Sequence, residues 1–114
     1  MERVYNKLVR DKIPEIIKQK GEEPITRILE SKEYKISLEE KLFEEYKEVI
    51  ESSEEERLEE LADMIEVIKS LAESQNKTLE DVIELANQKR EKRGGFEKRI
   101  FLEKVIENKK TLIK

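Results

Sequence analysis

Apolar residues recur along most of the chain at the three- and four-residue spacing of an amphipathic helix, rather than alternating as in a half-buried strand. Together with start and stop signals, this pattern predicts four helices. The first should begin at Asp11, carry Pro14 in its first turn and end at Gly21. The second should begin at Ser37, as a capping box, and run to about Glu51.

The third helix is expected to pack directly against the second. Ser53 and Glu56 repeat the capping-box pattern, and the apolar spacing continues to about Ser74. Ser52 and Ser53 are then the only residues that interrupt the helical pattern between the two predicted helices. Because so short a connection cannot cross over, the two helices should form an antiparallel hairpin.

The fourth helix is predicted to begin at Thr78, which is paired with Asp81 in another capping box, and to end before Gly94. Two apolar segments outside the helices, residues 25–29 and 100–106, leave alternatives open. The first is a short strand or a loop, and the second is a strand beside it or a final short helix. The predicted fold class is all-α, a bundle of four main helices around the central hairpin.

Four carboxylates lie on the apolar side of the predicted hairpin. On an ideal helical wheel, Glu60 falls inside the apolar arc of its helix, whereas Glu45, Glu48 and Asp63 lie at the borders. A core-facing ionised carboxylate is costly unless it is paired or binds a metal. All four come to similar heights in an antiparallel hairpin, so we expect them to converge. Such oxygen ligands favour Mg²⁺, with Mn²⁺ as a substitute.

Composition narrows the chemistry that the chain can perform. The 114 residues are 46% charged, carry a net charge of -4, and include no histidine and no cysteine. Ser-His-Asp hydrolysis, imidazole or thiolate metal sites and disulfides are therefore excluded. Interspersed charges of both signs disfavour duplex nucleic acid as a partner. With no apolar run long enough to span a bilayer and no signal-peptide pattern, we expect a soluble cytoplasmic protein without a membrane partner.

The acidic residues also form a recognisable motif. Residues 44–48 read Glu-Glu-Tyr-Lys-Glu and residues 60–63 read Glu-Leu-Ala-Asp, which resembles the EExxE…ExxD signature of the MazG-like superfamily. This superfamily of all-α nucleoside triphosphate pyrophosphohydrolases includes the phosphoribosyl-ATP pyrophosphohydrolases. Residues 7–14 (Lys-Leu-Val-Arg-Asp-Lys-Ile-Pro) and 92–96 (Lys-Arg-Gly-Gly-Phe) are similar to one branch, small predicted house-cleaning pyrophosphatases for non-canonical nucleotides.

The resemblance implies a single domain over residues 1–114 that hydrolyses a nucleoside triphosphate to a monophosphate and pyrophosphate with magnesium. By position, the implied metal ligands are Glu45, Glu48, Glu60 and Asp63. Glu44 matches an adjacent acid of the signature, but it points away from the apolar stripe. The resemblance also implies a homodimer or a dimer of dimers.

Roles in catalysis and substrate binding follow from the residue types present. Without histidine, a glutamate is the reasonable base, and the predicted catalytic residues are Glu48, as the base, and Glu45. Basic side chains would hold the phosphates. The resemblance implies Lys89 and Arg93 in the fourth helix, with Arg99 as a further option, because family members often hold phosphates near the end of that helix. Arg10 and Lys12 near the N-terminus, with Lys7, are the other candidates.

Two other readings compete with an enzyme. The chain could be a catalytically silent helical dimerisation module, or a nucleotide-binding module without turnover. The acid at Glu60 argues against pure packing, because an interface would favour an apolar residue there. A carboxylate pair on a helix is also often just a solvated face, and each basic candidate is as compatible with a surface charge as with a phosphate contact.

Overall fold

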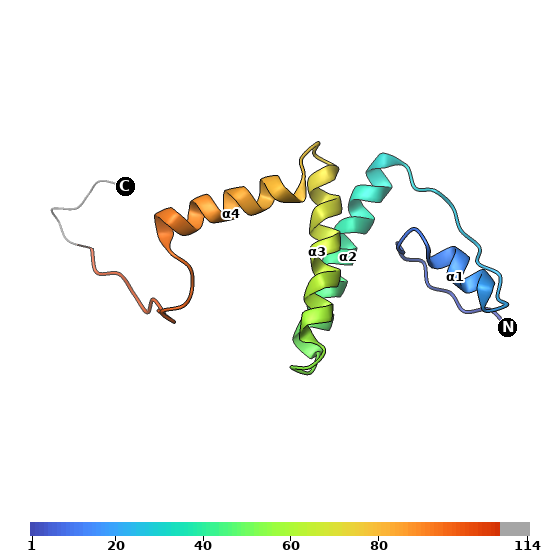
Figure 1. Cartoon of the computed structure of the whole chain (residues 1–114), viewed down its shortest axis with the longest axis horizontal. Coiled ribbons are helices and arrows are strands. Elements are labelled where there is room, and N and C mark those ends of the chain that lie inside the picture. The colour runs from blue at the N-terminus through green and yellow to red at the C-terminus, as the bar shows by residue number, and fades with distance from the viewer. Residues whose placement is uncertain (108–114) are drawn as a thin grey trace. The chain divides into compact units, whose positions relative to one another are not determined.

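The computed structural model describes residues 1–107, which contain four α-helices and no strand (Figure 1). The helices are α1 (Ile13–Gln19), α2 (Ser31–Glu51), α3 (Arg57–Glu73) and α4 (Leu79–Arg93). The predicted all-α class is confirmed. Residues 25–29 and 100–106 form neither a strand nor a helix, so the β pairing considered for them is not found in the described chain. Residues 108–114 of the predicted domain lie outside the described residues.

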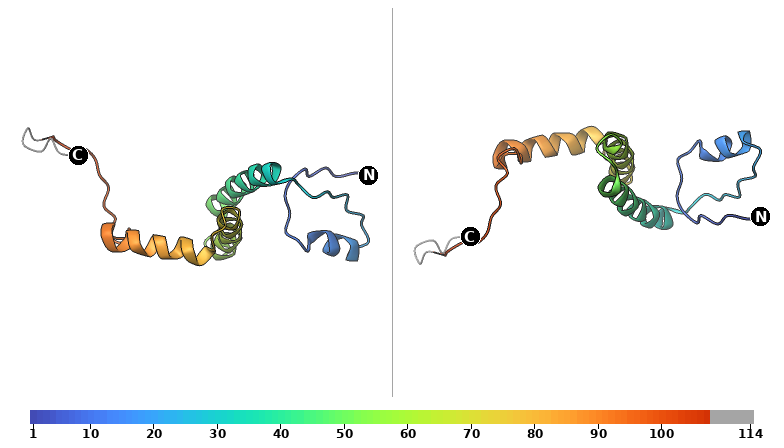
Figure 2. Two further views of the ribbon diagram at one scale, coloured as in Figure 1. Left: turned by 90° about the horizontal axis from the view of Figure 1, so that it is seen from above. Right: turned by 90° about the horizontal axis from the view of Figure 1, so that it is seen from below.

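The central feature is the hairpin of α2 and α3. The two helices run in opposite directions (Figure 1), lie side by side in the further views of Figure 2 as well, and pack against each other. The chain divides into two compact units, Met1–Val82 and a second that begins at Ile83. Within the first unit, α2 and α3 are the only two helices in contact. The predicted antiparallel hairpin is therefore confirmed.

Local signals set several helix ends where the sequence predicted them. After α1, Gly21 adopts the left-handed conformation (φ 84°) that glycine tolerates best, and Gly94 does the same (φ 83°) after α4. At the start of α4, the backbone N–H of Asp81 donates to Thr78 Oγ1 at 3.1 Å, and the Thr78 N–H donates to Asp81 Oδ2 at 2.9 Å. This reciprocal pair is the predicted capping box.

The predicted start of α2 at Ser37 is wrong, since the helix begins six residues earlier at Ser31. The intervening residues contain no glycine or proline, so nothing interrupts the helix. Glu30 holds the extended cap conformation, and the N–H of Tyr34 donates to its carbonyl at 2.8 Å. Ser37 therefore lies in the helix interior and caps nothing.

The start of α3 also differs slightly from the prediction. The capping contacts do form, since the N–H of Glu56 donates to Ser53 Oγ at 3.3 Å and this hydroxyl donates to Glu56 Oε1 at 3.2 Å. They close a turn that precedes the helix, and α3 itself begins at Arg57. Its end at Glu73 agrees with the sequence.

The hairpin holds the most buried apolar side chains of the described residues, Leu38 from α2 and Val67 and Ala72 from α3. Leu38 is the deepest, with 2% of its surface exposed. Many other large apolar side chains remain exposed. Among residues 1–107, no helix is both long and apolar enough to cross a membrane.

Stability should depend strongly on Leu38. Replacing Leu38 with alanine removes buried methyl groups and leaves a cavity, so the free energy of unfolding should fall by about 2–4 kcal/mol. Chemical denaturation followed by circular dichroism measures the change. Leu102, which is 73% exposed, offers a matched Leu→Ala control that should change stability by less than about 0.5 kcal/mol. Equal effects of the two substitutions would contradict this account of the core.

Candidate metal centre

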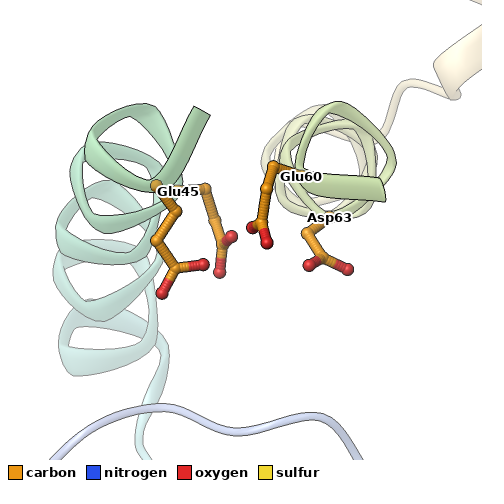
Figure 3. A group of neighbouring side chains, drawn as sticks. Glu45, Glu60 and Asp63 are labelled. Carbon is orange, nitrogen blue, oxygen red and sulfur yellow. The ribbon is translucent and has the colours of Figure 1, made fainter. Parts of the chain in front are cut away.

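Four carboxylates converge in the space between α2 and α3. Glu45 and Glu48 come from α2, and Glu60 and Asp63 come from α3; one oxygen of each lies within 4.8 Å of the others. Figure 3 shows Glu45 on one helix turned toward Glu60 and Asp63 on the other. The structure thus brings together the four acids that the helical wheel and the hairpin count selected.

The depth of these side chains differs from the wheel prediction, which placed Glu60 innermost and Glu45 at the border. Glu45 is the buried member, with 6% of its surface exposed, whereas Glu60 and Asp63 are half-buried and Glu48 is exposed. Glu45 lies seven residues after Leu38, on the same face of α2. Because α3 packs against that face of α2, Glu45 is covered by α3 although the wheel places it at the border of the apolar stripe.

Two carboxylate oxygens in the cluster are buried without a hydrogen-bond partner, Glu45 Oε2 and Glu60 Oε2. A buried polar atom without a partner costs free energy, and such atoms are rare in native proteins. When all four acids are ionised, no carboxyl group in the cluster can donate a hydrogen bond to another. The ionised neighbours therefore cannot supply a hydrogen bond to either oxygen.

The electrostatics of the cluster oppose full ionisation. Burial, followed by the charge of Glu48, raises the pKa of Glu45, although nearby Lys41 acts in the opposite direction. The pKa of Glu60 is also raised, first because a proton on it can be shared with Glu48, then through burial and the charges of Glu48, Asp63 and Glu45. The ionised cluster therefore carries excess negative charge.

Only part of this charge is compensated by the protein. Arg10 Nη2 lies 2.7 Å from Asp63 Oδ1, and Lys41 Nζ lies 3.7 Å from Glu45 Oε1. Glu48 and Glu60 form no ion pair within residues 1–107. Because Lys41 also pairs with Glu44 at 3.5 Å, the two cations offset only part of the negative charge of the four acids.

Lys41 is the member of the site that sequence reasoning missed. Its position four residues before Glu45 on the same helix was the available signal, because residues at that spacing are neighbours on a helix surface. Lys41 also contacts Glu44 at 3.5 Å, and Lys7 contacts the same Glu44 oxygen at 3.3 Å. Glu44 therefore lies outside the converging group, in agreement with its direction on the wheel.

The predicted phosphate-binding residues divide into two groups. Arg10 reaches the carboxylates through Asp63, whereas Lys12 occupies the N-cap of α1 and forms no ion pair within the described residues. Lys89 and Arg93 lie exposed on α4, in the unit that begins at Ile83. Their role in substrate binding stays a prediction.

The residues present fit a hard divalent cation. Ligands on opposite sides of an octahedral magnesium ion are about 4.2 Å apart, so four oxygens within 4.8 Å of one another need only small side-chain movements to bind one. All four are carboxylates, the ligand type that magnesium prefers. The two unpartnered oxygens and the uncompensated charge are what such an ion would satisfy.

Comparison with protein-family models, with curated proteins and with solved structures finds no match to this chain.

The raised pKa values predict how stability of the metal-free protein depends on pH. Glu45 and Glu60 bind protons more tightly in the folded chain than in the unfolded chain, so their contribution is fully present below the ordinary glutamate pKa and is lost as pH rises through the raised values. The melting temperature should therefore fall as the pH is raised above the ordinary glutamate pKa of about 4.3. Millimolar magnesium should reverse the fall.

Thermal unfolding followed by circular dichroism, with and without a chelator, checks this pH dependence. In the double variant Glu45→Gln/Glu60→Gln, the melting temperature of the metal-free protein should vary less over the same rise in pH. A metal-free melting temperature that rises with this increase in pH in the unaltered protein would contradict the assigned pKa directions.

Proposed function

We propose that the chain is a cytoplasmic, magnesium-dependent nucleotide pyrophosphohydrolase that converts a non-canonical nucleoside triphosphate to its monophosphate and pyrophosphate. The observation that carries the proposal is Glu45, which is buried at the helix interface, has one unpartnered oxygen and lies beside three further carboxylates. The resemblance of residues 44–48 and 60–63 to the MazG-like signature supports the choice of reaction.

The four acids would share the work of holding the metal. Glu45, Glu60 and Asp63 are the more enclosed members, and Glu48 is the exposed one. Bound magnesium, or manganese in its place, supplies positive charge that neutralises the triphosphate and polarises the phosphorus under attack. Without the metal, triphosphate and carboxylates would repel each other.

The proposed step is attack by water on the α-phosphorus. The oxygen of a water molecule bonds to that phosphorus, the bond to the oxygen between the α- and β-phosphates breaks, and pyrophosphate leaves. Glu48 is the proposed base that accepts the water proton, because it is the cluster member most accessible to solvent. Glu45, on the same helix, is the second proposed catalytic residue.

Basic side chains are proposed to hold the phosphates. Arg10 already lies at the cluster through Asp63, which supports its assignment. Lys12, Lys89 and Arg93 are proposed for the remaining phosphate oxygens, because lysine and arginine form charge-assisted hydrogen bonds with phosphate.

Product analysis tests the reaction. The protein is incubated with magnesium and a panel of canonical and damaged nucleotides, and the products are separated by ion-exchange chromatography. Monophosphate and pyrophosphate are expected, and Glu48→Gln should lower kcat by about 10²–10⁴-fold because the base is lost. Glu59→Gln, on an exposed neighbouring residue of α3, is the matched control and should retain activity.

Metal binding separates the enzyme from its alternatives. Calorimetric titration with Mn²⁺ should show binding that falls at least about tenfold in Glu60→Gln and Asp63→Asn, provided that circular dichroism shows these variants folded. Orthophosphate as the first product would exclude the mechanism. Metal binding without turnover would favour a nucleotide-binding module, and absence of metal binding would favour a dimerisation module.

We also propose that the protein assembles as a homodimer or a dimer of dimers. Each helix of the hairpin carries an exposed apolar row at helical spacing: Phe43, Tyr46 and Ile50 on α2, and Leu58, Leu61 and Ile65 on α3. The Phe43 and Tyr46 rings lie 6.2 Å apart, within the range of an aromatic pair. Exposed apolar rows of this kind are typical of faces that a second subunit covers.

Light scattering coupled to size-exclusion chromatography tests the assembly. The unaltered protein should elute as a dimer or tetramer, and Phe43→Glu should shift it toward a monomer because a charge cannot be buried in an apolar interface. Ile25→Glu places the same charge at an exposed apolar position outside the helices and should leave the mass unchanged. A monomeric mass for the unaltered protein would reject the proposal.

A further inference from the structure

The N-terminal segment that precedes α1, residues 1–12, contacts both helices of the hairpin beside the carboxylate cluster. Two ion pairs hold it there, one to each helix of the hairpin: Lys7 with Glu44 of α2 at 3.3 Å, and Arg10 with Asp63 of α3 at 2.7 Å. In Figure 3, the blue ribbon of this segment passes below the carboxylates. Positions far apart in the sequence therefore meet at the site.

The ion pair between Arg10 and Asp63 is exposed to solvent and uses only part of the hydrogen-bonding capacity of Arg10. The side chains of Arg10 and Asp63 are 56% and 43% exposed, and an exposed ion pair contributes little to stability. Of the five N–H donors of the Arg10 guanidinium, only one on Nη2 forms a hydrogen bond within residues 1–107. The remaining donors are available to another anion.

Lys41 provides the contrast within the same cluster. Its side chain is only 17% exposed, and it contacts two acids of its own helix, Glu44 and Glu45. Because Lys41 is anchored by helix geometry and partly buried, it is a fixed charge. Arg10 is carried on an irregular segment, outside any helix, so it can move without unfolding a helix.

We propose that Arg10 is a displaceable counterion of the metal centre. In the free protein its guanidinium neutralises Asp63; when the metal and the triphosphate bind, it leaves Asp63 and binds phosphate oxygens. This inference rests on the proposed function. The exchange is favourable because the cation replaces Arg10 at the carboxylate, and the planar guanidinium can form two parallel hydrogen bonds to a phosphate.

The proposal predicts opposite effects of one substitution on two ligands. Arg10→Gln removes a positive charge beside the ion, so Mn²⁺ should bind the nucleotide-free protein about five- to tenfold more tightly than it binds the unaltered protein. The same variant lacks the phosphate contact, so inorganic tripolyphosphate, added with saturating magnesium, should bind about tenfold more weakly. Isothermal titration calorimetry measures both affinities.

Arg27→Gln is the matched control, because Arg27 also forms an exposed pair with a glutamate, Glu33 at 3.1 Å, which lies outside the carboxylate cluster. It should change neither affinity. Arg10→Lys keeps the charge and should therefore leave Mn²⁺ affinity close to that of the unaltered protein. A merely structural role for Arg10 would not tighten metal binding in one variant and spare it in the other.

The outcomes separate this inference from the proposed function. If the unaltered protein binds Mn²⁺ and folded Arg10→Gln binds it equally or more weakly, Arg10 orients Asp63 and the counterion role is rejected. Unchanged tripolyphosphate affinity in Arg10→Gln would also reject it, since the transfer to phosphate would not occur. If the unaltered protein binds no Mn²⁺, the proposed function fails and this inference fails with it.

Discussion

The packing of α3 against the Leu38 face of α2 is the constraint on which the rest of the structure depends. It creates the buried contact of the hairpin and, by the same geometry, brings four carboxylates to within 4.8 Å of one another. Like charges at that distance repel, and burial of Glu45 adds to the cost of ionisation. Ionisation of all four acids therefore destabilises the hairpin, and positive charge in the cluster offsets part of that cost.

The chain supplies part of this charge from two kinds of source. Lys41 is fixed by its own helix, whereas Arg10 arrives on the irregular N-terminal segment and remains exposed. Together they offset part of the negative charge, and the two unpartnered buried oxygens belong to Glu45 and Glu60. Neutral side chains at these positions would pack at less cost. A divalent cation, as proposed above, would supply positive charge and bind the carboxylate oxygens.

The exposed apolar surface of the hairpin is the reason why a second subunit is proposed. Burial of large apolar side chains in the described residues is limited, and each helix keeps an exposed apolar row on another face. An interface formed by those rows would bury apolar surface. It would not place further negative charge over the carboxylates. Assembly and metal binding would then stabilise the same pair of helices through different faces.

The sequence by itself determined those features whose physical causes are local. Gly21 and Gly94 end helices because glycine tolerates positive φ, Thr78 and Asp81 begin one through hydrogen bonds within a single turn, and a short connection forces the hairpin that brings the four acids together. The failure at Ser37 has the same origin, because a capping signal competes with an uninterrupted run of helix-compatible residues before it. Only the tertiary structure decided which acid is buried and which cations meet the cluster. The depth of Glu45 depends on the face that α3 covers, and the pairing of Arg10 with Asp63 joins positions 53 residues apart, so neither is encoded in the spacing of neighbouring residues.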